Sequence, residues 1–73
     1  MNVQIRFGEA VRKYRQMKQI SQEEFAEMCG LHRTYISDIE CFRRSISLDN
    51  IQKIADALKI PTYKLFIDSE ESK

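Results

Sequence analysis

Glycine and proline are scarce in this 73-residue sequence, which contains two glycines and one proline. It also lacks runs of alternating apolar and polar residues bounded by turn residues, so it carries neither the strand signals nor the hairpin signals of a β-sheet. A chain of this length forms one domain that buries only about 60% of the surface of its unfolded chain, so its core is small. We expect an all-α fold.

Histidine and cysteine are also rare. The single histidine, His32, and the two cysteines, Cys29 and Cys41, have the spacing neither of a metal site nor of a disulfide framework. The sequence has no glycine-rich phosphate loop and no nucleophile paired with a base. We therefore expect no enzyme, no cofactor and no metal.

Long apolar runs are missing too. None approaches the roughly 18 to 20 residues of a membrane-spanning helix, and no secretory leader is recognisable, so we expect a cytoplasmic protein without a membrane partner. The net charge of +1 at pH 7 alone gives little support for a nucleic-acid partner. However, residues 1–66 hold eleven of the twelve Lys and Arg but only eight of the eleven Asp and Glu. We expect a mildly basic domain over residues 1–67 and a short acidic tail, residues 68–73, that frays.

Apolar residues recur at spacings of three and four, which predicts amphipathic helices. Phe7, Val11 and Tyr14 share one face of the first helix, and a stripe runs from Leu48 to Leu58 in the fourth. The expected helices are the first over residues 4–18, a second between Ser21 and Gly30, a third from Leu31 or His32, a fourth capped by Ser47, and a short fifth from Pro61 to Phe66.

Residues 22–40, QEEFAEMCGLHRTYISDIE, contain two helix-forming segments separated by one glycine. Neither segment reaches the roughly twelve residues that an isolated helix needs in water, so their mutual geometry must matter. Gly30 suits the left-handed position that ends a helix, Ala26 is small where the two helices would approach, and Ile36 and Ile39 form a narrow apolar stripe on the second. This pattern is typical of a helix-turn-helix, whose second helix enters the DNA major groove.

At these residues the chain resembles the Xre or lambda-repressor-like helix-turn-helix family, over Phe7 to Phe66. The segments HRTYISDIE, SISLDNIQKIADALKI and YKLF are most similar to the controller proteins of bacterial restriction-modification systems. The resemblance implies a compact five-helix DNA-binding domain, encoded by a bacterium or a phage. It also implies a homodimer that activates its own promoter and represses it at high dose.

The resemblance implies RNA polymerase as a further partner. Glu23, Glu24 and Glu27 form either an acidic patch for its sigma subunit or an ordinary solvated helix face. Two other functions stay open. One is a phage or chromosomal repressor of the same family, and the other is an antitoxin that acts mainly through a protein partner.

The polar face of the third helix supplies the predicted base contacts, which are Arg33, Thr34, Tyr35, Ser37 and Asp38. The guanidinium group of Arg33 can donate two hydrogen bonds to guanine, and the Thr34 methyl group can contact thymine. Alternatively, Arg33 only neutralises a phosphate, and Tyr35 lies across the helix surface.

Contacts to the DNA backbone are expected from Gln22, Arg43, Arg44 and Ser45. Gln22 begins the second helix, where relatives use this position for a phosphate. The two arginines follow the third helix, where a solvated charge pair is the alternative. Phe42 stands where relatives usually carry glycine, so this loop is either strained or takes another path.

Two charged residues fall on inward faces. Arg15 follows Phe7 by eight positions and Glu40 follows Ile36 by four, which predicts a buried ion pair joining the first and third helices, as in relatives.

Near the end of the domain, apolar residues exceed what a thin bundle can bury. We expect a dimer interface there, formed by Ile60, Tyr63, Phe66 and Ile67, unless these residues only cap the core.

Overall fold

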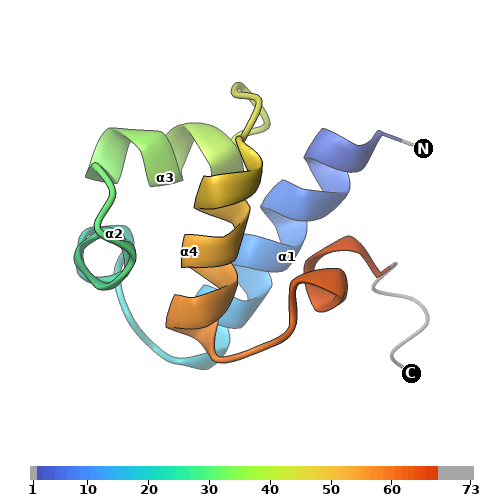
Figure 1. The fold of residues 1–73 in the computed structure, drawn as a ribbon. Coiled ribbons are helices and arrows are strands. Elements are labelled where there is room, and N and C mark those ends of the chain that lie inside the picture. The colour runs from blue at the N-terminus through green and yellow to red at the C-terminus, as the bar shows by residue number, and fades with distance from the viewer. Residues whose placement is uncertain (1, 68–73) are drawn as a thin grey trace.

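The computed structural model describes residues 2–67, and the expected acidic tail lies outside the described residues. The elements are α1 (Val3–Met17), α2 (Gln22–Cys29), α3 (Arg33–Glu40), α4 (Leu48–Leu58) and the 3₁₀ helix η1 (Thr62–Phe66). No strand occurs between residues 2 and 67, and the prediction of an all-α fold is confirmed. In Figure 1, α2 and α3 form one end of the molecule, while η1 lies at the other, beside α1.

Side chains cap the start of each α-helix. Asn2 accepts hydrogen bonds from the backbone of residues 4 and 5, so α1 begins one residue earlier than predicted. A capping box starts α2, because Ser21 Oγ accepts from the Glu24 backbone at 3.0 Å and Glu24 Oε1 accepts from the Ser21 backbone at 2.9 Å. These bonds satisfy backbone donors that a helix start leaves unpaired.

Two helix boundaries differ in kind from the prediction. His32 is the cap of α3 rather than part of it, because its Nδ1 accepts from the Thr34 backbone at 3.2 Å. The fifth helix is a 3₁₀ helix of five residues, and Pro61 precedes it as its cap. A segment this short makes few backbone hydrogen bonds, and 3₁₀ geometry is common in such connectors.

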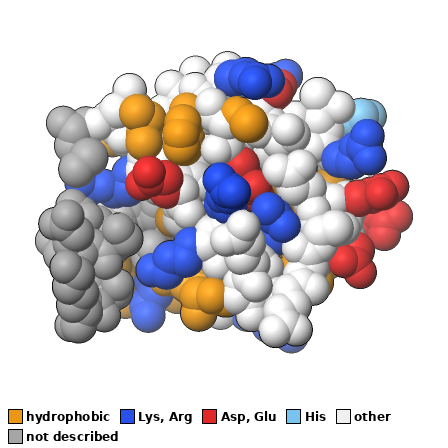
Figure 2. Space-filling model, turned by 180° about the vertical axis from the view of Figure 1, so that it is seen from behind, with side chains coloured by type: hydrophobic (Ala, Val, Ile, Leu, Met, Phe, Trp, Pro, Cys, Tyr) orange, Lys and Arg blue, Asp and Glu red, His pale blue; other side chains and the backbone are white. Residues whose placement is uncertain are grey.

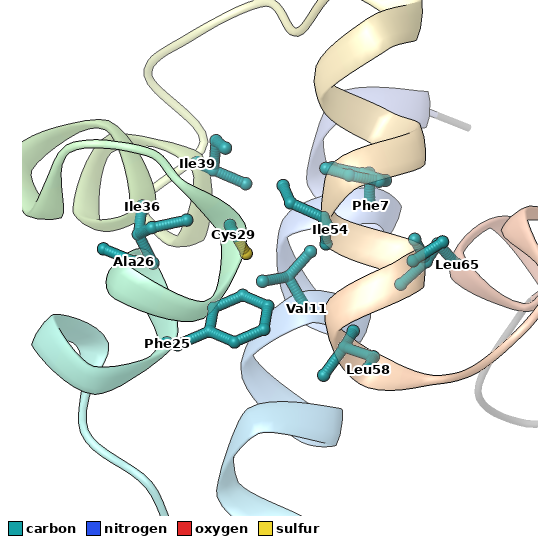
Figure 3. Packing of buried hydrophobic residues seen from close by; sticks show 11 residues of the cluster. Phe7, Val11, Phe25, Ala26, Cys29, Ile36, Ile39, Ile54, Leu58 and Leu65 are labelled. Carbon is teal, nitrogen blue, oxygen red and sulfur yellow. The ribbon is translucent and has the colours of Figure 1, made fainter.

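Apolar side chains from all five elements meet in one core. Figure 3 shows Val11 of α1, Phe25 of α2 and Leu58 of α4 directed toward one another. Leu48 is an exception to the predicted stripe of α4, since it is 84% exposed. It is the first residue of α4 and lies at the edge of the stripe. The buried apolar residues are Phe7, Val11, Phe25, Ala26, Cys29, Ile36, Ile39, Ile54, Ala55, Leu58 and Leu65.

Gly8 lets α1 approach the end of α3. A Cβ atom at this position would collide with the Ile39 carbonyl oxygen and lie 2.8 Å from Cδ1 of Phe42. Phe42 itself has a φ of 65°, the left-handed conformation that bulky residues rarely adopt. The loop is therefore strained, and the ring of Phe42 covers the glycine of α1.

We expect Gly8→Ala to lower the free energy of unfolding by about 1–3 kcal/mol, because the added methyl group overpacks the contact between α1 and α3. Helix propensity alone predicts the opposite sign, a gain of about 1 kcal/mol. Urea denaturation measures the difference. The exposed neighbour Glu9 provides a control, since Glu9→Ala should change stability by less than about 0.5 kcal/mol. A stabilised Gly8→Ala variant would show that the contact is looser than described.

Candidate nucleic-acid interface

The carboxylate of Glu40 lies at the junction of α1, α2 and α3. Arg15 Nε donates to Glu40 Oε2 at 2.7 Å, and Arg15 Nη2 donates to Glu40 Oε1 at 3.0 Å. The two side chains are 12% and 3% exposed. Arg15 Nη1 also donates to the Ile20 carbonyl oxygen at 2.9 Å. The structure thus brings together the two residues expected to pair, in a two-pronged geometry that is stronger than a single contact.

Gln22 joins the same network. Its Nε2 donates to Glu40 Oε1 at 3.0 Å, so Glu40 receives hydrogen bonds from both α1 and α2. The hydrogen bond to Glu40 raises the pKa of Arg15, which keeps the guanidinium charged despite its burial. Gln22 was expected at a DNA phosphate. One of its amide hydrogens is occupied here, and the second stays available.

An open groove of about 570 Å³ separates the start of α2 from the outer face of α3. Three predicted base-reading residues contribute to it. The Arg33 side chain is 66% exposed, and its Nη1 lies 4.0 Å from Glu23 Oε1, an exposed ion pair that contributes little to stability. The residues that line the groove are Arg15, Ser21, Gln22, Glu23, Arg33, Thr34 and Ser37.

The other two predicted base readers lie on the opposite flank of α3 and contact a loop residue. Arg44 Nη2 donates to Asp38 Oδ2 at 3.1 Å, and the Arg44 guanidinium carbon lies 4.9 Å from the centre of the Tyr35 ring. Asn50 Nδ2 of α4 donates to the Tyr35 hydroxyl at 2.9 Å. Nothing in the sequence distinguished Asn50 from any polar residue in the first turn of a helix.

The remaining predicted contacts to the DNA backbone are exposed. Arg43 and Ser45 lie in the loop that joins α3 to α4. The backbone amide of Arg43 donates to the Asp38 carbonyl oxygen at 2.9 Å, while its side chain has no hydrogen bond or ion pair within residues 2–67. This loop therefore carries one arginine that lies over α3 and a neighbouring one whose side chain faces solvent.

The four predicted dimer residues differ in exposure. Tyr63 is 61% exposed and Ile67 is exposed at the end of η1, whereas Ile60 and Phe66 are half-buried. Phe66 stacks on Phe7 with 5.3 Å between ring centres. Phe66 therefore covers part of the core, which is the alternative that the sequence left open to a dimer interface.

Acidic side chains gather at the end of the molecule formed by α2 and α3 (Figure 2). Glu23, Glu24 and Glu27 are all exposed on α2.

Within residues 2–67, no cluster of three His, Cys, Asp or Glu side chains could hold a metal ion. None of the helices in this same range is long and apolar enough to cross a membrane.

The helix-turn-helix family model matches residues 11–65. Control protein C.BamHI of Bacillus amyloliquefaciens is 53% identical over 60 residues, which cover 81% of this chain and 74% of that protein. Control protein C.MunI of a Mycoplasma species is 44% identical over 71 residues, which cover 96% of each chain. The crystal structure of the restriction-modification controller protein C.AhdI from Aeromonas hydrophila superposes with a TM-score of 0.83 and 41% identity, covering 86% of this chain and 96% of that one.

These similarities confirm the resemblance to helix-turn-helix regulators and to controller proteins. The relatives are control proteins rather than enzymes, in agreement with the sequence analysis.

We expect Glu40→Ala to lower the free energy of unfolding by about 3–5 kcal/mol, because it leaves the largely buried charge of Arg15 without a carboxylate to balance it. Thermal or urea denaturation followed by circular dichroism measures this loss. The double replacement Arg15→Met with Glu40→Leu removes both charges and should be clearly more stable than Glu40→Ala. A loss below about 1 kcal/mol for Glu40→Ala would mean that the pair behaves as a surface contact.

Proposed function

Because this chain belongs to the helix-turn-helix family and is a DNA-binding transcription regulator of the restriction-modification controller type, we propose that it binds a palindromic operator as a homodimer and regulates its own promoter. The groove between α2 and α3 is the observation that carries this proposal. Its walls are the start of one helix, with backbone donors suited to a phosphate, and the exposed polar face of the next.

Arg33 is the strongest candidate for reading a base within this groove. It is the first residue of α3, and within residues 2–67 its exposed guanidinium forms only the weak ion pair with Glu23, which DNA can replace. An arginine at this position can donate two hydrogen bonds to O6 and N7 of a guanine in the major groove. Thr34 and Ser37 line the groove beside it and complete the proposed base contacts there.

Contacts to the DNA backbone are proposed for residues on both sides of α3. On one side, the second amide hydrogen of Gln22 is available for a phosphate, and the hydrogen bond from Gln22 Nε2 to Glu40 holds this side chain at the groove. On the other side, Arg43 and Ser45 are exposed in the loop after α3. Such contacts set the position and orientation of the protein on DNA and add no sequence preference of their own.

A dimer would use the end of the domain that carries η1. Tyr63 and Ile67 supply its exposed apolar area, and the half-buried Ile60 and Phe66 continue that surface toward the core. A two-fold pair of recognition helices about 34 Å apart would match two half-sites separated by one turn of DNA. The operator is therefore expected to be a palindrome with that spacing.

Activation at low dose and repression at high dose are proposed from the similarity to control proteins. The exposed carboxylates of Glu23, Glu24 and Glu27 on α2 are the proposed contact for the sigma subunit of RNA polymerase. A phage or chromosomal repressor would share the operator and lack the activation. An antitoxin would copurify with a stoichiometric protein partner.

Selection of bound sequences from random duplex DNA at near-physiological salt tests the proposal. The natural sequence should yield a two-fold symmetric motif, and Arg33→Ala should lose about 1–3 kcal/mol of discrimination at one base pair in each half-site. Lys53→Ala removes one positive charge from the exposed face of α4 and serves as the control, with an unchanged motif. The proposal is wrong if the natural sequence yields no motif above salt-sensitive background.

The dimer is tested by sedimentation equilibrium at micromolar concentration. The natural sequence should have twice the chain mass of 8.7 kDa, and Tyr63→Asp should weaken association at least tenfold, because it would bury a charge between the copies. Met17 is equally exposed and apolar on α1, so Met17→Asp should not affect association. If the natural sequence stays monomeric, or if both variants behave alike, the assigned interface is incorrect.

A further inference from the structure

Asp38 is covered in a way that its position on α3 does not predict. At about 100° per residue, Thr34 and Asp38 lie on the side of the helix opposite the buried Ile36, Ile39 and Glu40. A residue in that direction normally projects into solvent. The side chain of Asp38 is nevertheless only 21% exposed, because Arg44 from the following loop lies over it and donates to Oδ2 at 3.1 Å.

Arg44 belongs to a connected set of side chains on this flank. Its guanidinium lies against the face of the Tyr35 ring, an arrangement in which the planar cation and the aromatic ring attract each other. Asn50 then holds the Tyr35 hydroxyl, and the backbone of Asn50 is itself fixed by the cap Ser47 at 3.2 Å. The start of α4 thereby restrains Tyr35, and Arg44 from the loop restrains Asp38.

We propose that Arg44 is a positioning residue that fixes Asp38 and Tyr35 for base recognition, and that Asp38 held in this way selects a base with an exocyclic amino group. This inference rests on the proposed function of the α3 face. With Oδ2 occupied by Arg44, the other oxygen of the carboxylate is left to accept a hydrogen bond. Cytosine N4 is the donor in the major groove that carboxylates recognise.

Arg44 also changes the electrostatics of this flank. A carboxylate facing DNA without a partner repels the phosphates, whereas the pair of Asp38 and Arg44 is neutral. A loop arginine that contacts phosphate needs only its positive charge, and lysine serves as well. An arginine that stacks on a ring and donates to a carboxylate uses its planar shape, which lysine cannot reproduce. Replacement of Arg44 by lysine therefore distinguishes the two roles. It should preserve a contact to phosphate and abolish the positioning of Asp38 and Tyr35.

The experiment compares Arg44→Lys with Arg43→Ala. Arg43 is the matched control, because it carries the same charge one position earlier in the same loop, and its side chain has no hydrogen bond or ion pair among residues 2–67. For each variant, the base preferences of both half-sites are determined by selection from random duplex DNA. The dependence of the association constant on salt is measured on the selected operator.

We expect Arg44→Lys to lose about 5- to 100-fold of preference at one base pair per half-site, different from the one read by Arg33, with the salt dependence unchanged. Arg43→Ala should weaken binding to all sequences alike and reduce the slope of log K against log salt by about 0.9, the loss of one phosphate contact. In an Asp38→Asn background, Arg44→Lys should change that preference less than twofold, because the two residues act through one contact.

The positioning role is overturned if Arg44→Lys keeps the natural motif and affinity while Arg44→Ala lowers the salt slope as Arg43→Ala does. It is also overturned if Arg44→Lys has the same effect with and without Asp38. In both cases the natural sequence still selects a motif, so the proposed function stands. Failure of the proposed function is distinct, because the natural sequence then selects no motif at all.

Discussion

The buried carboxylate of Glu40 is the interaction on which the arrangement of the helix-turn-helix depends. It receives two hydrogen bonds from Arg15 of α1 and one from Gln22 of α2, while its own backbone ends α3. Helices of eight residues, as α2 and α3 are, do not persist alone in water. Their angle must be set by contacts between elements. The apolar core supplies most of the stability, and the directional bonds to one carboxylate help to select this packing among others of similar burial.

The outer face of α3 has two flanks with different properties. On the α2 flank, Arg33 lines an open groove, and in the part of the chain that the structure describes its only ion pair is the weak one with Glu23. On the α4 flank, Asp38 lies beneath Arg44, which is in turn stacked on Tyr35. A mobile side chain loses entropy when it binds, whereas a restrained one has lost it on folding. In the proposed DNA complex, the two flanks therefore contribute differently, the first by adapting to DNA and the second by requiring a fitting base.

The loop after α3 connects the outer face of this helix to the core. Phe42 is strained at a φ of 65°, and its ring lies against Gly8 of α1. A glycine would adopt the same backbone conformation without strain but could not cover α1. The conformation of Phe42 sets the course of the chain at the point where Arg43 and Arg44 diverge. One of these arginines lies over α3 and the other faces solvent, although they are adjacent in the sequence.

The sequence by itself determined the helices, the caps Ser21 and Ser47 and the inward positions of Arg15 and Glu40, because each depends on spacing along one helix and on the chemistry of single residues. Local patterns of this kind are repeated in the three-dimensional structure with little change. The tertiary structure alone decided that Arg44 lies over Asp38, that Asn50 holds Tyr35 and that Leu48 is exposed. These outcomes depend on the path of a strained loop and on where the core ends. Both follow from how the helices pack, and no periodicity in the sequence encodes them.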